Sequence, residues 1–139
     1  MITKDTFVRG SKSGIETIIT MSKVILPVFF VVKVLEKMNV INFIAGYLEP
    51  LTKLFGLPGE AAVPLVLGNA INIYAALAAI EPLGLSPKHV TILAVMISFS
   101  HTLPVETAVS KRVGVSAFMI IGIRLGLAAV SGIVLNLIL

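Results

Sequence analysis

Long apolar stretches constrain the fold of this chain more than any other feature. About 20 apolar residues cross the hydrocarbon core of a membrane, and we expect crossings over residues 18–35, 58–80, 89–109 and 113–139. Only 13% of the 139 residues are charged, against about a quarter in an ordinary soluble domain. The sequence therefore excludes a soluble globule. It predicts a single-domain, all-α integral membrane protein with about four transmembrane helices.

The charged and sulfur-containing residues narrow the range of partners. The net charge is +4, but the basic residues form no cluster with interleaved aromatic residues, so we expect no nucleic acid. The chain has no Cys, which excludes disulfides, thiolate metal sites and cysteine nucleophiles. We expect the lipid bilayer as a partner, and we expect no cofactor and no resident metal.

Two segments have the pattern of helices that lie in the membrane interface. In residues 1–22, Ile15, Ile18 and Ile19 share one helical face, and Lys12 and Glu16 lie off it. In residues 41–55, the polar positions recur at spacings of four, three and four: Asn42, Gly46, Glu49 and Lys53. Such spacing puts them on one face of an amphipathic helix. We expect this second helix to break or bend near Pro50, and the first crossing to kink at Pro27.

The third apolar stretch turns polar in its second half. Pro104 lacks an amide hydrogen and disfavours helix at the residue before it, which predicts a discontinuous helix near residues 98–107. Irregular backbone at membrane depth is tolerated only inside protein or beside a water-filled cavity. The polar residues of this segment are our main candidates for substrate binding: Ser98, Ser100, His101, Thr102, Glu106 and Thr107. Alternatively, Ser, Thr and His only satisfy the backbone groups that Pro104 frees.

Three further residues inside apolar stretches can contribute to a pathway. Asn69 and Asn72 are three positions apart, so in a continuous helix they share one face. They either contact a ligand or join neighbouring helices by hydrogen bonds. Arg124 lies near the middle of the last crossing, where a lone cation is costly, and we expect it to pair with Glu106. Small residues on the other side of that helix favour close packing there: Gly122 and Gly126.

A short repeat links two parts of the chain. Residues 57–63 (LPGEAAV) and 103–109 (LPVETAV) match at five of seven positions, 46 residues apart. Each unit is typical of a helix start, because Pro fits the first turn and Glu faces the positive end of the helix dipole. Glu60 and Pro104 are therefore candidate structural residues of a pathway. The two units are either related elements of a transport core or independent helix caps.

Basic residues that flank the four expected crossings are evenly divided between the two sides of the membrane. One side has Lys4, Arg9, Lys12 and Lys88, and the other has Lys37, Lys53, Lys111 and Arg112. Without a positive-inside bias, we expect insertion in both orientations and an antiparallel homodimer with the symmetry of an inverted repeat. Alternatively, a second chain of similar fold but different charge supplies the other half.

Three segments resemble the nucleoside recognition, or Gate, domain family: 57–62 (LPGEAA), 68–72 (GNAIN) and 100–107 (SHTLPVET). The family is similar to the gates of the ferrous iron transporter FeoB, to concentrative nucleoside transporters and to spore maturation proteins A and B. The resemblance implies a multi-pass domain of a cell membrane, the prokaryotic cytoplasmic membrane, that forms a pathway with a second Gate domain. It implies pathway roles for Asn69, Asn72, His101, Thr102 and Glu106. The gates of iron transporters resemble sites with Cys, and this chain has no Cys, which weakens the case for iron as the cargo.

These observations predict a membrane transport protein, or half of one, that moves a small polar solute or ion. The alternative is a non-transporting assembly subunit of a two-chain system. We expect no enzyme, because protease and phosphate-binding motifs are missing and only His101 with Ser98 or Ser100 could pair a base with a nucleophile. The residues leave the substrate, the coupling ion, the direction of transport and the orientation in the membrane open.

Overall fold

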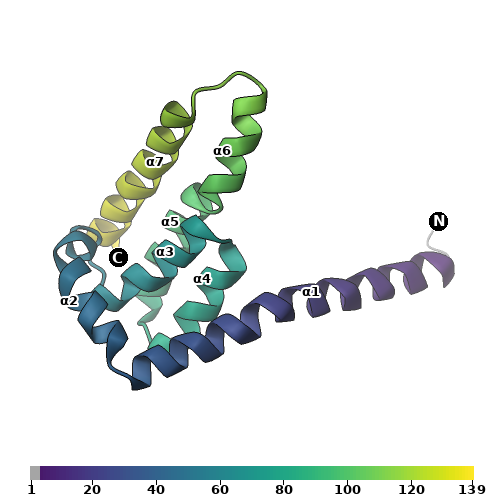
Figure 1. The fold of residues 1–139 in the computed structure, drawn as a ribbon, viewed down its shortest axis with the longest axis horizontal. Coiled ribbons are helices and arrows are strands. Elements are labelled where there is room, and N and C mark those ends of the chain that lie inside the picture. The colour runs from purple at the N-terminus through teal and green to yellow at the C-terminus, as the bar shows by residue number, and fades with distance from the viewer. Residues whose placement is uncertain (1–3) are drawn as a thin grey trace.

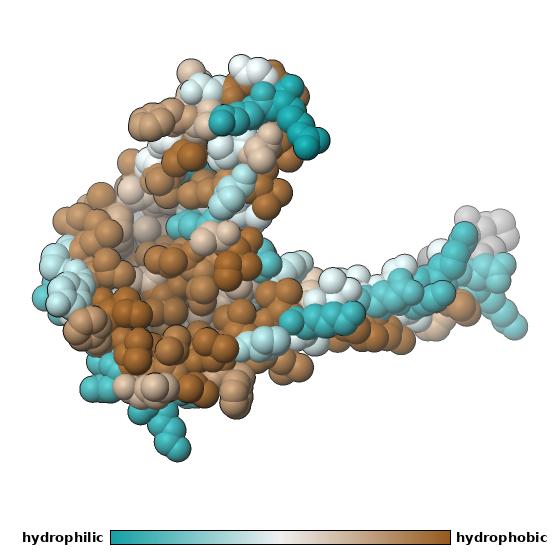
Figure 2. All heavy atoms as spheres, viewed as in Figure 1, coloured by the Kyte–Doolittle hydropathy of each residue, from teal (hydrophilic) through white to brown (hydrophobic). Residues whose placement is uncertain are grey.

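The N-terminal part of the chain is one long helix. The computed structural model describes residues 4–139, and α1 (Lys4–Lys37) takes up 34 of them, a length of about 51 Å. Its first half extends away from the body of the molecule (Figure 1), and residues 4–20 are all exposed. Figure 2 shows polar residues along one side of this arm and apolar residues along the other.

The sequence predicted two separate elements here, an interfacial helix over residues 1–22 and a crossing from about Ile18. The structure has no boundary between them, because α1 continues through both segments and through Pro27. Residues 1–3 of the expected interfacial helix lie outside the described residues. The position of its remainder at a membrane surface stays a prediction.

The second expected amphipathic segment is a helix. It consists of α2 (Val40–Thr52), which continues past Pro50, and the 3-10 turn η1 (Lys53–Phe55), after which Gly56 adopts the left-handed conformation at φ 65°. The predicted polar face is exposed, whereas Ile41, Ala45 and Thr52 are buried. The 3-10 turn η2 (Gly59–Ala61) packs against α2. A Cβ atom at Gly59 would lie 2.4 Å from the backbone oxygen of Ala45, so this contact requires glycine.

The segment 58–80, expected as one crossing, is instead a pair of short helices that pack against each other. They are α3 (Ala62–Ala70) and α4 (Ile73–Ile80), followed by the 3-10 turn η3 (Glu81–Leu83). The helix stops because Asn72 is extended and its side chain caps α4 by accepting a hydrogen bond from the amide of Ala75 at 2.9 Å. Nine residues make α3 about 13 Å long, roughly half of the hydrocarbon core. Neither helix of this hairpin is long enough to cross the hydrocarbon core by itself.

The discontinuous helix predicted near residues 98–107 is confirmed. Helix α5 (Pro87–Ser100) ends at His101, and α6 (Leu103–Arg112) begins after Thr102, which has a left-handed φ of 56°. The last helix, α7 (Ala117–Ile138), packs along both halves (Figure 1). A Cβ atom at Gly132 would lie 2.6 Å from the sulfur of Met96, so Gly132 provides the close approach. The chain itself places nothing within 4 Å of such an atom at Gly122 or Gly126.

The core is centred on α5. Its inner face, including Ile92, Leu93 and Ile97, is buried against Leu57, Ala61, Ala76 and Ala128. Large apolar side chains cover the outside (Figure 2), and Phe118 is 91% exposed. Among residues 4–139, three helices are long and apolar enough to cross a membrane: Lys4–Lys37, the broken helix Pro87–Arg112, and Ala117–Ile138. The chain is thus an all-α membrane protein with three such helices and one hairpin.

Candidate functional site

The hairpin and the broken helix meet at their irregular segments. The amide of Thr102, in the break, donates a hydrogen bond of 2.9 Å to the carbonyl of Gly68, near the end of α3. Gly68 also lets the two hairpin helices approach, because a Cβ atom there would lie 3.1 Å from Cβ of Ala76. The extended conformation of His101, at ψ 154°, turns the Thr102 amide away from the helical path of α5. Each irregular segment thereby supplies a partner for a polar backbone group of the other.

Arg124 of α7 holds the two halves of the broken helix together. Its Nε donates a hydrogen bond of 2.7 Å to the carbonyl of Phe99, at the end of α5. Its Nη1 forms an ion pair with Oε2 of Glu106, in the first turn of α6, which confirms the predicted pairing. Both contacts are electrostatically favourable, because the C-terminal end of α5 is negative and the N-terminal end of α6 favours a carboxylate.

His101 extends this cluster. Its Nδ1 lies 2.9 Å from the hydroxyl oxygen of Thr102 and 3.8 Å from Oε1 of Glu106. The side chain of Arg124 is 18% exposed and that of Glu106 is 40% exposed, so the cluster reaches from the interior to the surface. With a neutral imidazole, the charges of Arg124 and Glu106 cancel.

The remaining polar residues of the break have different environments. The hydroxyl of Ser98 is exposed and donates to the carbonyl of Ala94, and the buried hydroxyl of Ser100 donates to that of Met96. Both bond to their own helix, so the structure gives them no contact with the cluster. The hydroxyl oxygen of Thr107 is buried without a hydrogen-bond partner. Pro104 lies in the first turn of α6 and is exposed.

Asn69 and Asn72 do not share a helical face, contrary to the prediction. Helix α3 ends at Ala70, so the spacing of a continuous helix does not apply to this pair. Asn69 lines a largely apolar cavity of about 330 Å³ that Ser100 also lines, and its Oδ1 is buried without a partner. Asn72 lies at the tip of the hairpin and lines a different cavity.

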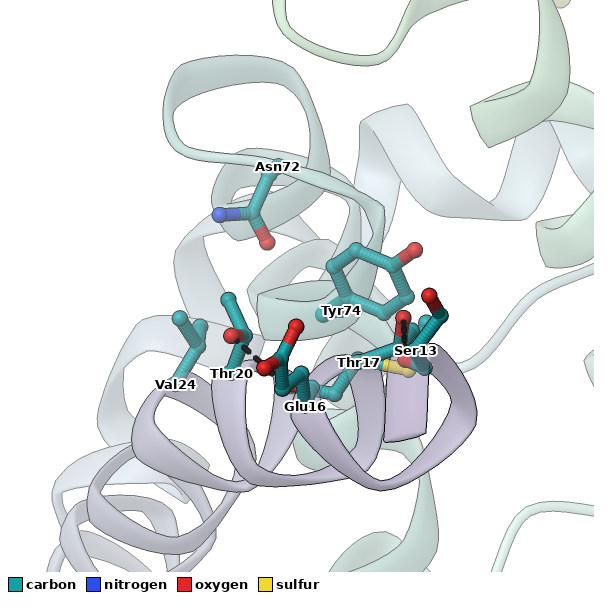
Figure 3. Close-up of a pocket in the computed structure, with 8 residues that line it drawn as sticks. Ser13, Glu16, Thr17, Thr20, Val24, Asn72 and Tyr74 are labelled. Atoms are coloured by element: carbon teal, nitrogen blue, oxygen red, sulfur yellow. Dashed lines mark hydrogen bonds between the residues drawn. The ribbon is translucent and has the colours of Figure 1, made fainter. Parts of the chain in front are cut away.

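The second cavity lies between the hairpin tip and the exposed half of α1 (Figure 3). Its volume is about 580 Å³, and polar and apolar side chains line it together: Ser13, Glu16, Thr17, Thr20, Met21, Val24, Asn72 and Tyr74. The α1 residues that line this cavity were not predicted from the sequence. A signal was present, because Ser13, Glu16, Thr17 and Thr20 recur at spacings of three, one and three, which is a polar helical stripe.

The repeated LP-x-E units both begin helices, as predicted. Pro58 precedes η2, and Pro104 lies in the first turn of α6. Glu60 is separated from the break by the whole length of α3, and it lines a surface pocket with Asn42 and Glu49. The two glutamates thus begin equivalent helical turns in different parts of the molecule.

Comparisons with known proteins agree with this architecture. The family model described as "Gate: Nucleoside recognition" matches residues 18–124. An "Uncharacterized membrane protein YvoD" of Bacillus subtilis (strain 168) is 48% identical over 135 residues, which are 97% of this chain and 43% of the relative. The chain therefore spans less than half the length of that relative. No solved structure matches. Because the family model covers most of the chain, including both the hairpin and the break, this protein belongs to the Gate, or nucleoside recognition, family.

Proposed function

We propose that this protein is half of a membrane transporter that moves a small polar solute or ion through a site completed by a second Gate domain. The observation that carries the proposal is the contact between the hairpin tip and the helix break, through the hydrogen bond from Thr102 to Gly68. Two irregular segments meeting inside an apolar chain are typical of transporter binding sites, where broken helices present polar groups at mid-depth.

In this proposal the residues have separate roles. Arg124 fixes the two halves of the broken helix, and its pair with Glu106 keeps the local charge near zero until cargo or a proton arrives. Asn72 presents its side-chain amide at the hairpin tip. His101 lies between Thr102 and Glu106, where its ring can donate or accept a hydrogen bond. Thr107 and Asn69 have buried oxygens without a hydrogen-bond partner among the described residues.

The hairpin changes how two halves can combine. Three crossings put the two ends of α1–α7 on opposite membrane sides, so a second unit that follows in the same chain is automatically inverted. The relative is more than twice as long as the matched region, which leaves room for such a unit. We therefore propose an antiparallel pairing with a second Gate domain, from another copy or from a sister chain.

The same topology revises the charge balance. Lys4, Arg9, Lys12, Lys111 and Arg112 now fall on one side, and Lys37, Lys53 and Lys88 fall on the other. Five basic residues against three give an orientation bias, so an antiparallel homodimer has to overcome it. This difference favours a sister chain over a second copy.

The experiment is uptake into vesicles reconstituted with the purified protein, alone and with any co-purifying partner. Radiolabelled nucleosides, divalent cations and small organic ions are screened as cargo. We expect Glu106→Gln and Asn72→Ala to abolish uptake while size-exclusion chromatography shows unchanged assembly. Full uptake by both variants contradicts the proposed site.

A non-transporting assembly subunit is the second candidate, and one observation favours it. The backbone carbonyls of Ile97, Phe99 and Gly68 already have protein partners, so the break can be purely structural. In that case a partner membrane protein loses its assembly when this chain is deleted, and Glu106→Gln restores assembly as well as the wild type does. An enzymatic role has little support, since His101 contacts Thr102 and Glu106, whereas the Ser98 and Ser100 hydroxyls bond to their own helix.

A further inference from the structure

The cavity between α1 and the hairpin tip contains one charged side chain, Glu16 (Figure 3). Among residues 4–139, no basic group forms an ion pair with this carboxylate: the ion pairs involve Glu36, Glu49 and Glu106. Lys12 lies one helical turn before Glu16 but does not line the cavity. The cavity therefore has an uncompensated negative charge.

The position of Glu16 leaves its carboxylate accessible to a solute. Glu16 is exposed, and it lines the cavity together with Asn72 of the hairpin tip (Figure 3). Thr20, one helical turn further along α1, lines the same cavity. Because no basic side chain among the described residues lines the cavity with it, the carboxylate attracts a cation from solution.

The other polar groups around Glu16 are mostly acceptors. The hydroxyls of Thr17 and Thr20 donate to the backbone carbonyls of Ser13 and Glu16 at 2.8 Å, so their oxygens face the cavity as acceptors. Asn72 differs, because its Oδ1 accepts from Ala75 and leaves the side-chain NH₂ as a donor. The ring of Tyr74 also lines the cavity and offers an aromatic face to a cation.

The dimensions favour an organic cation over a bare metal ion. About 580 Å³ is room for a small solute, and residues 4–139 contain no group of three or more His, Cys, Asp or Glu that could hold a metal. We propose that this cavity binds a small organic cation, with an ammonium group at Glu16 and a hydroxyl or carbonyl oxygen at the amide of Asn72. The assignment rests on the proposed function, since it names the chemical class of the cargo.

Equilibrium dialysis with radiolabelled ethanolamine tests the proposal on the full chain in maltoside detergent. Ethanolamine has an ammonium group and a hydroxyl, and ethylene glycol is its neutral isostere. We expect saturable binding of ethanolamine and none of ethylene glycol. Glu16→Gln is expected to weaken binding by about 10- to 100-fold, because hydrogen bonds to charged groups are roughly that strong.

Two variants serve as controls. Asp5→Asn removes another exposed carboxylate from α1 outside the cavity and is expected to bind like the wild type. Glu16→Asp keeps the charge and is expected to retain binding within a few-fold. Unchanged affinity in Glu16→Gln, or no saturable binding by the wild type, overturns the proposal. So does a Glu16→Gln variant that changes only the oligomeric state, because the carboxylate then pairs with a partner chain.

The outcomes separate this inference from the proposed function. Ethanolamine binding that depends on Glu16, with no uptake of any solute, supports the cavity and rejects transport. Uptake of a neutral solute that depends on Glu106 and Asn72, without ethanolamine binding, supports transport and rejects the cationic cargo.

Discussion

Arg124→Met tests whether one side chain holds the broken helix together. The variant removes the charged hydrogen bond to the Phe99 carbonyl, at 2.7 Å, and the ion pair with Glu106. A hydrogen bond to a charged group contributes about 1.5–3 kcal/mol. The ion pair adds only about 0.5 kcal/mol, because Glu106 is 40% exposed and solvent screens it. We therefore expect Arg124→Met to lower the free energy of unfolding by about 2–3.5 kcal/mol.

Glu106→Gln separates the two contributions. It removes the ion pair and keeps the hydrogen bond to Phe99, so we expect a loss of about 0.5 kcal/mol. Arg124→Lys keeps the positive charge, but the compact ammonium group of Lys lacks the planar guanidinium that contacts both the Phe99 carbonyl and Glu106. We therefore expect an intermediate loss in the free energy of unfolding. Arg112→Met is the matched control, because Arg112 is exposed at the end of α6.

Equilibrium unfolding in mixed micelles, with SDS as denaturant and far-UV circular dichroism as the signal, measures these differences. Two results refute the reasoning. One is an Arg124→Met variant as stable as Arg112→Met. The other is equal destabilisation by Arg124→Met and Glu106→Gln, which would make the ion pair, and not the bond to the α5 carbonyl, the main contribution of Arg124.

Three further tests address the architecture. Gly59→Ala places a Cβ atom 2.4 Å from the backbone oxygen of Ala45, and we expect a loss of about 1–3 kcal/mol in the same unfolding assay. Gly46→Ala, with open space inside α2, is expected to stabilise by about 0.5–1 kcal/mol instead, because Ala favours a helix interior over Gly. Asn72→Ala removes the cap of α4 and is expected to cost about 1 kcal/mol; Asn72→Asp keeps the acceptor, so equal destabilisation by both contradicts the capping role. The chain has no Cys, so a single introduced cysteine reports on which side of the membrane its position lies. In oriented vesicles, we expect a thiol reagent to label Ser11→Cys from one side and both Ser86→Cys and Leu139→Cys from the other. Labelling of Ser11→Cys and Leu139→Cys from the same side rejects three crossings.

The sequence predicted the elements whose signals are local. Pro104 locates the break in the third stretch because proline disfavours helix at the residue before it and fits the first turn of a new helix, whereas α1 and α2 continue through Pro27 and Pro50. The polar face at residues 41–55 follows from helical periodicity alone, and the Glu106–Arg124 pair follows from the cost of a lone cation at depth. The turn at Asn72 has a weaker signal. Asn is a preferred helix cap, but the apolar residues that continue on both sides favour one uninterrupted crossing.

The missed cavity has a similar cause. The stripe of Ser13, Glu16, Thr17 and Thr20 was visible as polarity on one side of a helix, but polarity on an exposed helix usually faces water. Only the position of the hairpin tip opposite α1 makes the stripe part of a site, and that position depends on the turn at Asn72. One unrecognised cap therefore hid the second helix of the hairpin, the number of crossings and the lining of the cavity.

The hairpin and the break depend on each other for a physical reason. A helix that stops at membrane depth leaves amide and carbonyl groups without intrahelical partners, and lipid cannot satisfy them. In this protein the Thr102 amide bonds to Gly68 of the hairpin, and Arg124 bonds to the Phe99 carbonyl. A sequence with one clear break inside an apolar stretch should therefore contain a second irregular segment that faces it. In a Gate domain with a proline at the first break, a capping residue such as Asn72 is the signal to seek in the neighbouring stretch.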